Sequence, residues 1–150
     1  LSRPEREVFS IVGDGAFMMT CMEILTATKE GLGIAYFVFH DGELSQIAQA
    51  QEIPYNRKPC AVLGSVNLEG VALATGAAYV RMENDAAIAG AIAEARRIAA
   101  TGRPVVVDVN IDYSKRTAFT KGAVKTNFKR CPLAQRLRMV SRALLRKVTG

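Results

Sequence analysis

Four short apolar runs stand out along the chain and predict β-strands. Each run is rich in β-branched or aromatic residues and is bounded by glycine, proline or polar residues. Continuous apolar runs of this length are typical of strands that are buried on both faces of a parallel sheet. The predicted strands cover residues 8–12, 34–39, 79–82 and 105–111.

Longer helix-forming segments lie between these runs. Asn67 is a suitable N-cap for a helix of small residues, and Asn84 or Asp85 is a suitable N-cap for a long alanine-rich helix. A polar, proline-marked loop over residues 52–64 either covers a site or crosses the surface. The predicted helices cover residues 16–25, 44–51, 67–77 and 86–100.

The alternation of strands and helices predicts an α/β fold. Right-handed crossovers would place the strands parallel in one sheet, with helices on its faces. Ligands of such folds bind outside the C-terminal ends of the strands. Candidate binding residues are therefore expected where the predicted strands end.

Acidic residues follow the first two predicted strands. Asp14 lies between two glycines after the first strand, and Asp41 follows the second strand 27 positions later. Neighbouring parallel strands would bring both carboxylates to one sheet edge, where oxygen ligands of this kind suit Mg²⁺. Gly-Asp-Gly alone is an ordinary turn sequence, so the second acid at this spacing is what favours a metal site.

The same strand end is suited to a phosphate. Gly15 frees the turn after Asp14, and the helix predicted to follow would direct its first free N–H groups back toward the strand end. The pattern therefore predicts a divalent metal held against a diphosphate.

Two segments carry a resemblance to a known family. Residues 12–17, VGDGAF, and residues 39–44, FHDGEL, resemble the thiamine-diphosphate motif of the acetolactate synthase and pyruvate decarboxylase superfamily. The resemblance is to the C-terminal diphosphate-binding domain, is closest to acetolactate synthase large subunits, and covers about residues 3–112. It implies a thiamine-diphosphate-binding fold whose first strand and helix precede this sequence, so that the sheet is truncated at its N-terminal edge.

The resemblance also implies a set of site residues. Asp14 and Asp41 would be metal ligands, together with the backbone carbonyl of Glu43. Backbone N–H groups of the GDGAF segment would hold the diphosphate. Ser45 and Gln46 either lie over the thiazolium ring or are simply the first turn of a helix. The implied cofactor-binding residues are Gly13, Asp14, Gly15, Ala16, Phe17, Asp41, Glu43, Ser45 and Gln46; none is expected to be catalytic.

One position departs from the family pattern. His40-Asp41 stands where the family usually has two asparagines. The extra carboxylate would strengthen the hold on the metal and weaken the hold on the cofactor, or require a nearby cation, because like charges at close range are costly. His40, the only histidine, is either an acid or base or a strand-end residue that hydrogen-bonds its surroundings.

The composition is that of a globular domain. The chain has 150 residues, of which 49% are hydrophobic, and it contains no apolar run long enough to span a membrane and no signal-peptide pattern. Its three cysteines form no CxxC pair, so neither a zinc site nor a disulfide framework is indicated. A cytoplasmic location with reduced thiols is expected.

The last part of the chain has a different character. Residues 113–150 contain eleven Lys or Arg and no Asp or Glu, whereas residues 1–112 carry nine basic and fourteen acidic residues. We therefore expect a partial thiamine-diphosphate and Mg²⁺ domain over 1–112 and a basic tail over 113–150, with an amphipathic helix over 133–148. Three partners fit that helix: an acidic face of its own assembly, an anionic membrane, or nucleic acid. The charges favour the first, and the lack of interleaved aromatic residues argues against the third.

These features together predict part of a thiamine-diphosphate-dependent enzyme that acts on a 2-oxo acid. Acetolactate synthase-like carboligation after decarboxylation is expected, and another decarboxylase or lyase on the same scaffold is the nearest alternative. The resemblance places the remaining catalytic groups, and any flavin (FAD), in further domains or a partner subunit of a homo-oligomer. The chain alone should therefore be an incomplete and inactive portion. A non-catalytic remnant with a basic binding tail is the alternative from a different class.

Overall fold

A computed structural model describes residues 6–55, 57–64, 66–113, 122, 125–126 and 128–149. The chain forms two compact units. The sheet unit comprises Leu1–Gly42 and Gly64–Ile111, and the helical unit comprises Glu43–Leu63 and Asp112–Gly150. The two units are described separately below.

A four-stranded parallel sheet forms the centre of the sheet unit. The strand order is β1-β2-β4-β3, with every neighbouring pair parallel. The predicted parallel α/β fold is therefore confirmed, and each observed strand lies within about a residue of its predicted bounds. The strands are β1 (Val8–Gly13), β2 (Ile34–His40), β3 (Ala78–Met82) and β4 (Val105–Asn110).

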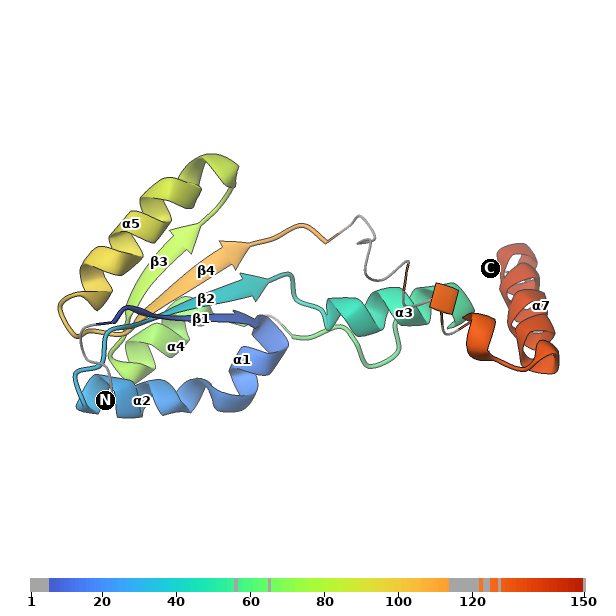
Figure 1. Cartoon of the computed structure of the whole chain (residues 1–150), viewed down its shortest axis with the longest axis horizontal. Coiled ribbons are helices and arrows are strands. Elements are labelled where there is room, and N and C mark those ends of the chain that lie inside the picture. Colours follow the sequence, from blue (N-terminus) through green and yellow to red (C-terminus); the bar gives the residue numbers. More distant parts are fainter. Residues whose placement is uncertain are drawn as a thin grey trace. The chain divides into compact units, whose positions relative to one another are not determined.

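Helices cover both faces of the sheet, as Figure 1 shows. One face carries α1 (Asp14–Thr20), α2 (Ile24–Lys29) and α4 (Leu68–Thr75), and the other carries α5 (Ile88–Ala99). Each face has its own hydrophobic core, one centred on Val38, Val106 and Leu68, the other on Val105, Val107 and Ala95. Successive β4 residues thus point into opposite cores, which explains the unbroken apolar run in its sequence.

The helix predicted over residues 16–25 is divided in the structure. It starts at Asp14, and a 3₁₀ turn at Cys21–Glu23 separates α1 from α2. The buried positions in this region are Phe17, Cys21, Ile24 and Ala27. Cys21, Ile24 and Ala27 are spaced by three, which is the repeat of a 3₁₀ helix, so the tighter turn keeps them on the side that faces the sheet.

Asparagine side chains cap two helices of the sheet unit. The Asn67 side chain accepts a hydrogen bond from the Gly70 N–H at the start of α4. Asn84 rather than Asp85 caps the second helix, by accepting from the N–H groups of Ala86 and Ala87. That helix begins with a 3₁₀ turn, Asp85–Ala87, before α5.

The helical unit contains α3 (Ser45–Tyr55) and α7 (Leu133–Thr149), which pack against each other. α3 runs four residues beyond the predicted end at residue 51 and takes the first part of the predicted loop. The remainder of that loop returns to the start of α3, where the Leu44 N–H donates to the Ala61 carbonyl and Lys58 pairs with Glu43 at 2.8 Å. α7 covers the predicted 133–148 helix.

Within the described residues, no helix is long and apolar enough to cross a membrane. The division into a domain over 1–112 and a tail over 113–150 stays a prediction, and most of residues 114–127 lie outside the described residues.

Candidate functional site at the C-terminal edge of the sheet

The ends of three neighbouring strands bring polar residues together. Gly13 of β1 is in register with Phe39 of β2, and His40 of β2 is in register with Asn110 of β4. The sites that follow β1 and β2 therefore lie at one edge of the sheet, as the sequence predicted.

Asp14 is the most buried charged residue at this edge, with 1% of its surface exposed. Its Oδ2 accepts a hydrogen bond of 2.8 Å from the Gly42 N–H, and its Oδ1 accepts one of 2.7 Å from the Gly15 N–H. The bond to Gly42 joins the segment after β1 directly to the segment after β2. Buried carboxylates are costly unless they are hydrogen-bonded, so these two N–H groups account for Asp14 remaining buried.

The main chain at Gly13 and Gly42, which flank the Asp14 carboxylate, borders open space. A carboxylate has about four lone-pair positions, and two N–H groups occupy only half of them. A Cβ atom added at Gly13 or Gly42 would meet no heavy atom within 4 Å, and the φ angle of +72° at Gly42 favours glycine. A phosphate group could therefore approach the main chain at these two glycines.

The other predicted binding residues of the GDGAF segment belong to α1. The Gly15 N–H, expected to hold a diphosphate, is directed to Asp14 in this structure. Phe17 is buried in the core beside Tyr36, so its side chain is structural and only its backbone is available to a ligand. Their roles in cofactor binding remain predictions.

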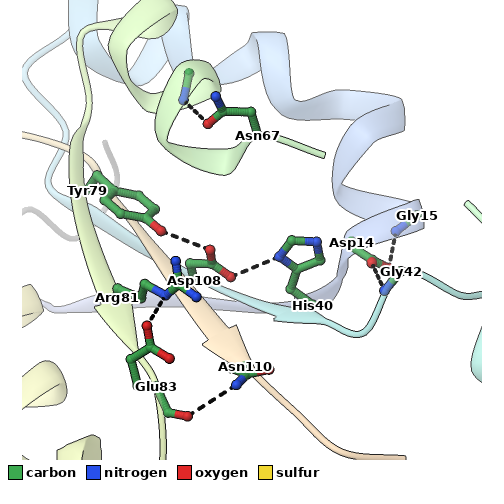
Figure 2. Close-up of polar contacts among 11 residues, drawn as sticks. Asp14, Gly15, His40, Gly42, Asn67, Tyr79, Arg81, Glu83, Asp108 and Asn110 are labelled. Atoms are coloured by element: carbon green, nitrogen blue, oxygen red, sulfur yellow. Dashed lines mark hydrogen bonds and ion pairs between the residues drawn. The ribbon is translucent and has the colours of Figure 1, made fainter. Parts of the chain in front are cut away.

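A second buried carboxylate, Asp108, organises the same edge of the sheet (Figure 2). Its Oδ1 lies 3.1 Å from Nδ1 of His40, and its Oδ2 accepts a hydrogen bond of 2.9 Å from the Tyr79 hydroxyl. The three side chains come from β2, β4 and β3, so they link three adjacent strands. His40 therefore hydrogen-bonds its surroundings, one of the two roles expected for it.

The network has consequences for the protonation of its members. Burial, and then the hydrogen bond to Asp108, raise the pKa of Tyr79 to about 12. The hydroxyl thus stays protonated and remains a donor. With Asp108 accepting at Nδ1, the neutral His40 imidazole carries its proton on Nδ1 and offers an acceptor at Nε2.

Sequence reasoning missed Asp108 and Tyr79. A signal was present, because Asp108 interrupts an otherwise apolar run, and a charged residue in a buried strand requires hydrogen-bonding partners. The identity of those partners depends on the strand order, which places β4 between β2 and β3.

Three predicted site residues, Glu43, Ser45 and Gln46, belong to the helical unit. The Glu43 side chain pairs with Lys58, which is compatible with a role for its backbone carbonyl. Ser45 and Gln46 form the first turn of α3. Among the described residues, no group of three or more His, Cys, Asp or Glu side chains is arranged as a metal site. The predicted Mg²⁺ site uses two side chains, those of Asp14 and Asp41, and a backbone carbonyl, so the absence of a three-side-chain group among the described residues does not test it. This site stays a prediction.

A separate apolar hollow of about 530 Å³ lies on the face of the sheet that carries α5. α5 contacts β2, β3 and β4, and beside it Ile11 of β1 is 71% exposed and Phe9 is 45% exposed. The hollow is lined mainly by Phe9, Ile11, Phe37, Phe39, Ile88 and Ile92. No predicted site residue lines it.

Comparisons with known proteins show the family of the chain. Residues 1–109 match the family described as the thiamine pyrophosphate enzyme, C-terminal TPP binding domain. A putative acetolactate synthase large subunit of Mycobacterium tuberculosis is 37% identical over 112 residues, covering 75% of this chain and 20% of the relative. An acetolactate synthase of Bacillus subtilis is 32% identical over 114 residues, covering 76% of this chain and 20% of the relative.

A putative thiamine pyrophosphate-containing protein of Bacillus subtilis is 29% identical over 138 residues, covering 85% of this chain and 24% of the relative. This match reaches beyond residue 112, because residues 1–112 make up only about three quarters of the chain. The chain spans about a fifth of the length of the curated relatives that it matches first.

Proposed function

The chain belongs to the thiamine pyrophosphate enzymes, in their C-terminal cofactor-binding domain, and from this premise we propose that it forms the Mg²⁺ and diphosphate part of an enzyme acting on 2-oxo acids. The observation that carries the proposal is the bond from the Gly42 N–H to Asp14. It joins the GDG segment after β1 to the HDG segment after β2, the two segments on which the metal and diphosphate site depends.

Each residue has a specific part in this proposal. Asp14 and Asp41 would hold Mg²⁺ through carboxylate oxygens, with the carbonyl of Glu43 as a third ligand. The backbone N–H groups of Gly15 and Ala16 would bind diphosphate oxygens. The open space at Gly13 and Gly42 supports this arrangement, because it admits a ligand close to the main chain.

The cofactor brings its own chemistry, and the protein positions it. When bound, thiamine diphosphate supplies the carbanion stabilisation that decarboxylation of a 2-oxo acid requires. The residues of this chain would orient the diphosphate and hold the metal. The Tyr79–Asp108–His40 network would keep the His40 ring fixed beside Asp41.

Acetolactate synthase-like carboligation is the proposed overall reaction, since relatives that match are named acetolactate synthases. Another 2-oxo acid decarboxylase or lyase is the second candidate. We further propose that the chain alone is catalytically incomplete, which its coverage of a fifth of the relatives supports. Product analysis of the complete enzyme with pyruvate distinguishes the two reactions, because one forms acetolactate and the other acetaldehyde.

Calorimetric titration of the chain with thiamine diphosphate, with and without Mg²⁺, tests the proposed site. We expect Mg²⁺-dependent binding that Asp14→Asn weakens by about tenfold or more, because an uncharged amide oxygen holds Mg²⁺ less strongly than a carboxylate does. The matched control is Asp85→Asn, the same change at an exposed aspartate, which should bind like the wild type.

Stability must be measured alongside binding. Asp14→Ala leaves the Gly42 N–H without its acceptor and should lower the free energy of unfolding by about 1–3 kcal/mol. Asp14→Asn retains an acceptor oxygen and should cost less. Binding that is independent of Mg²⁺, or that a folded Asp14→Asn variant retains in full, would contradict the proposed site.

A further inference from the structure

The amphipathic helix α7 presents an apolar stripe that its own unit leaves uncovered. The stripe consists of five aliphatic residues at spacings of three and four, which places them along one side of a helix. Each is between 45% and 85% exposed. They are Leu133, Leu137, Val140, Leu144 and Val148.

A different side of α7 makes its contact within the helical unit. α7 packs against α3, and among the α7 residues whose side chains the structure describes, the half-buried ones are Arg136, Met139 and Ala143. These positions are also spaced by three and four, but they lie to one side of the stripe. Packing in this unit therefore does not explain why α7 carries the stripe.

The charge on α7 has one sign only. Its five charged residues are all Arg or Lys, and residues 113–150 contain no acid. Arg138 and Arg142 are exposed on the side of the helix away from the stripe. The partner of α7 must therefore offer both an apolar layer and negative charge.

The sheet unit is a weak candidate for that partner, although residues 1–112 carry an excess of acids. Three of its glutamates are already paired with arginines, in Glu7–Arg96, Glu83–Arg81 and Glu94–Arg97. Two further acids, Asp14 and Asp108, are buried and hydrogen-bonded. Other exposed acids of the described residues are spread over the unit, with Glu23, Glu30 and Glu69 on the face that carries α2 and α4 and Asp85 on the face that carries α5. These acids are divided between the two faces and do not gather into one acidic docking face.

We propose that α7 lies on an anionic lipid surface, with the stripe in the acyl boundary and the basic residues at the headgroups. A strongly amphipathic helix of low net hydrophobicity with a basic polar face is the type that binds in the plane of such a surface. Anionic lipids also attract clustered Lys and Arg. Nucleic acid supplies negative charge but no apolar layer for five aliphatic side chains.

Vesicle co-sedimentation of the 150-residue chain tests the proposal. One set of vesicles contains phosphatidylcholine alone. In the other set, phosphatidylglycerol, which is anionic, replaces part of the phosphatidylcholine. We expect binding to the anionic vesicles that weakens with added salt, since exposed charges are screened. Combining Leu137→Ser with Leu144→Ser should reduce this binding by about tenfold or more, because two apolar side chains are lost from the buried stripe.

Two matched controls separate the stripe and the charge from general effects. Leu73→Ser makes the same change at an exposed leucine of α4 and should bind like the wild type. Combining Arg138→Gln with Arg142→Gln should reduce binding several-fold, whereas Lys29→Gln on α2 should not. Circular dichroism confirms that each variant keeps its helix content.

Three results would overturn the proposal. The first is no preference for anionic vesicles over phosphatidylcholine. The second is a Leu137→Ser, Leu144→Ser variant that binds anionic vesicles as well as the wild type does, together with an oligonucleotide, at the same total charge as the lipid, that displaces the chain from the vesicles completely. This result would assign the helix to nucleic acid. The third is a wild-type chain that forms an oligomer, seen by light scattering, while the Leu137→Ser, Leu144→Ser variant is monomeric and neither the wild type nor the variant binds vesicles. This result would assign the stripe to contact with a second copy of the chain.

Discussion

Two buried carboxylates define the C-terminal edge of the sheet, and both are held by donors that come from other segments. Asp14 is bound by the N–H of Gly42, 28 residues away in sequence, and Asp108 is bound by Tyr79 and lies against His40. The positions of Asp14 and Asp41 at this edge could be predicted, because the GDG and HDG segments follow apolar runs. The pairing of Asp108 with Tyr79 and His40 could not, because it depends on which strands are neighbours in the sheet.

The stability of this network should depend on pH through Tyr79. Burial and the bond to Asp108 raise its pKa from an ordinary value of 10.0 to about 12. A raised pKa means that the contribution of Tyr79 is fully present below pH 10 and is lost as pH rises toward 12. At neutral pH, Tyr79→Phe should therefore lower the free energy of unfolding by about 1 kcal/mol.

Denaturant unfolding of both proteins at a series of pH values measures this effect. The stability difference between wild type and Tyr79→Phe should be constant near neutral pH and shrink between pH 10 and pH 12. Using the difference removes the contribution of lysines, which titrate in both proteins. If the stability difference between wild type and Tyr79→Phe stays unchanged throughout that window, the hydrogen bond to Asp108 does not raise the pKa of Tyr79.

At the scale of the elements, close packing of β2 against the end of α5 depends on a glycine. A Cβ atom at Gly33 would lie 1.7 Å from the Ala99 carbonyl oxygen, so the start of β2 and the end of α5 would have to separate. Gly33 belongs to the connection before β2, and its sequence context alone indicates only a turn. The need for glycine there follows from an approach between segments 66 residues apart in sequence.

Gly33→Ala should therefore lower the free energy of unfolding by about 3 kcal/mol or more, because backbone atoms cannot move aside as a side chain can. Gly90→Ala is the matched control within α5. A Cβ atom at Gly90 would meet nothing within 4 Å, and alanine should stabilise this helix by about 0.5–1 kcal/mol. Thermal or denaturant unfolding measures both changes, and equal effects of the two substitutions would refute the packing argument.

At the scale of the whole molecule, the parallel sheet organises the sheet unit unevenly. β4 pairs on both sides and has five successive buried residues, whereas β1 is an edge strand with exposed apolar side chains. Opening β1 breaks one ladder and exposes little new surface, but opening β4 breaks two ladders and both cores.

Native-state hydrogen exchange should reflect this difference. The amides of Val105–Asn110 should exchange most slowly, with a free energy of opening close to that of global unfolding, and those of Val8–Gly13 should exchange faster. β2, which is also paired on both sides, serves as an internal reference. Equal protection of β1 and β4 would mean that the edge strand is covered in solution by something that the described residues do not include.

The sequence by itself determined the fold class, the positions of the four strands and the two acidic segments, because these depend on local patterns of apolar runs, glycines and spacing. The resemblance carried by residues 12–17 and 39–44 likewise follows from short segments, and the match over residues 1–109 confirms it. Only the tertiary structure decided which side chains meet. The strand order puts Asp108 between His40 and Tyr79, and the turn after β2 directs the Gly42 N–H to Asp14. Such contacts join segments distant in sequence, so their partners are set by packing and not by any local pattern.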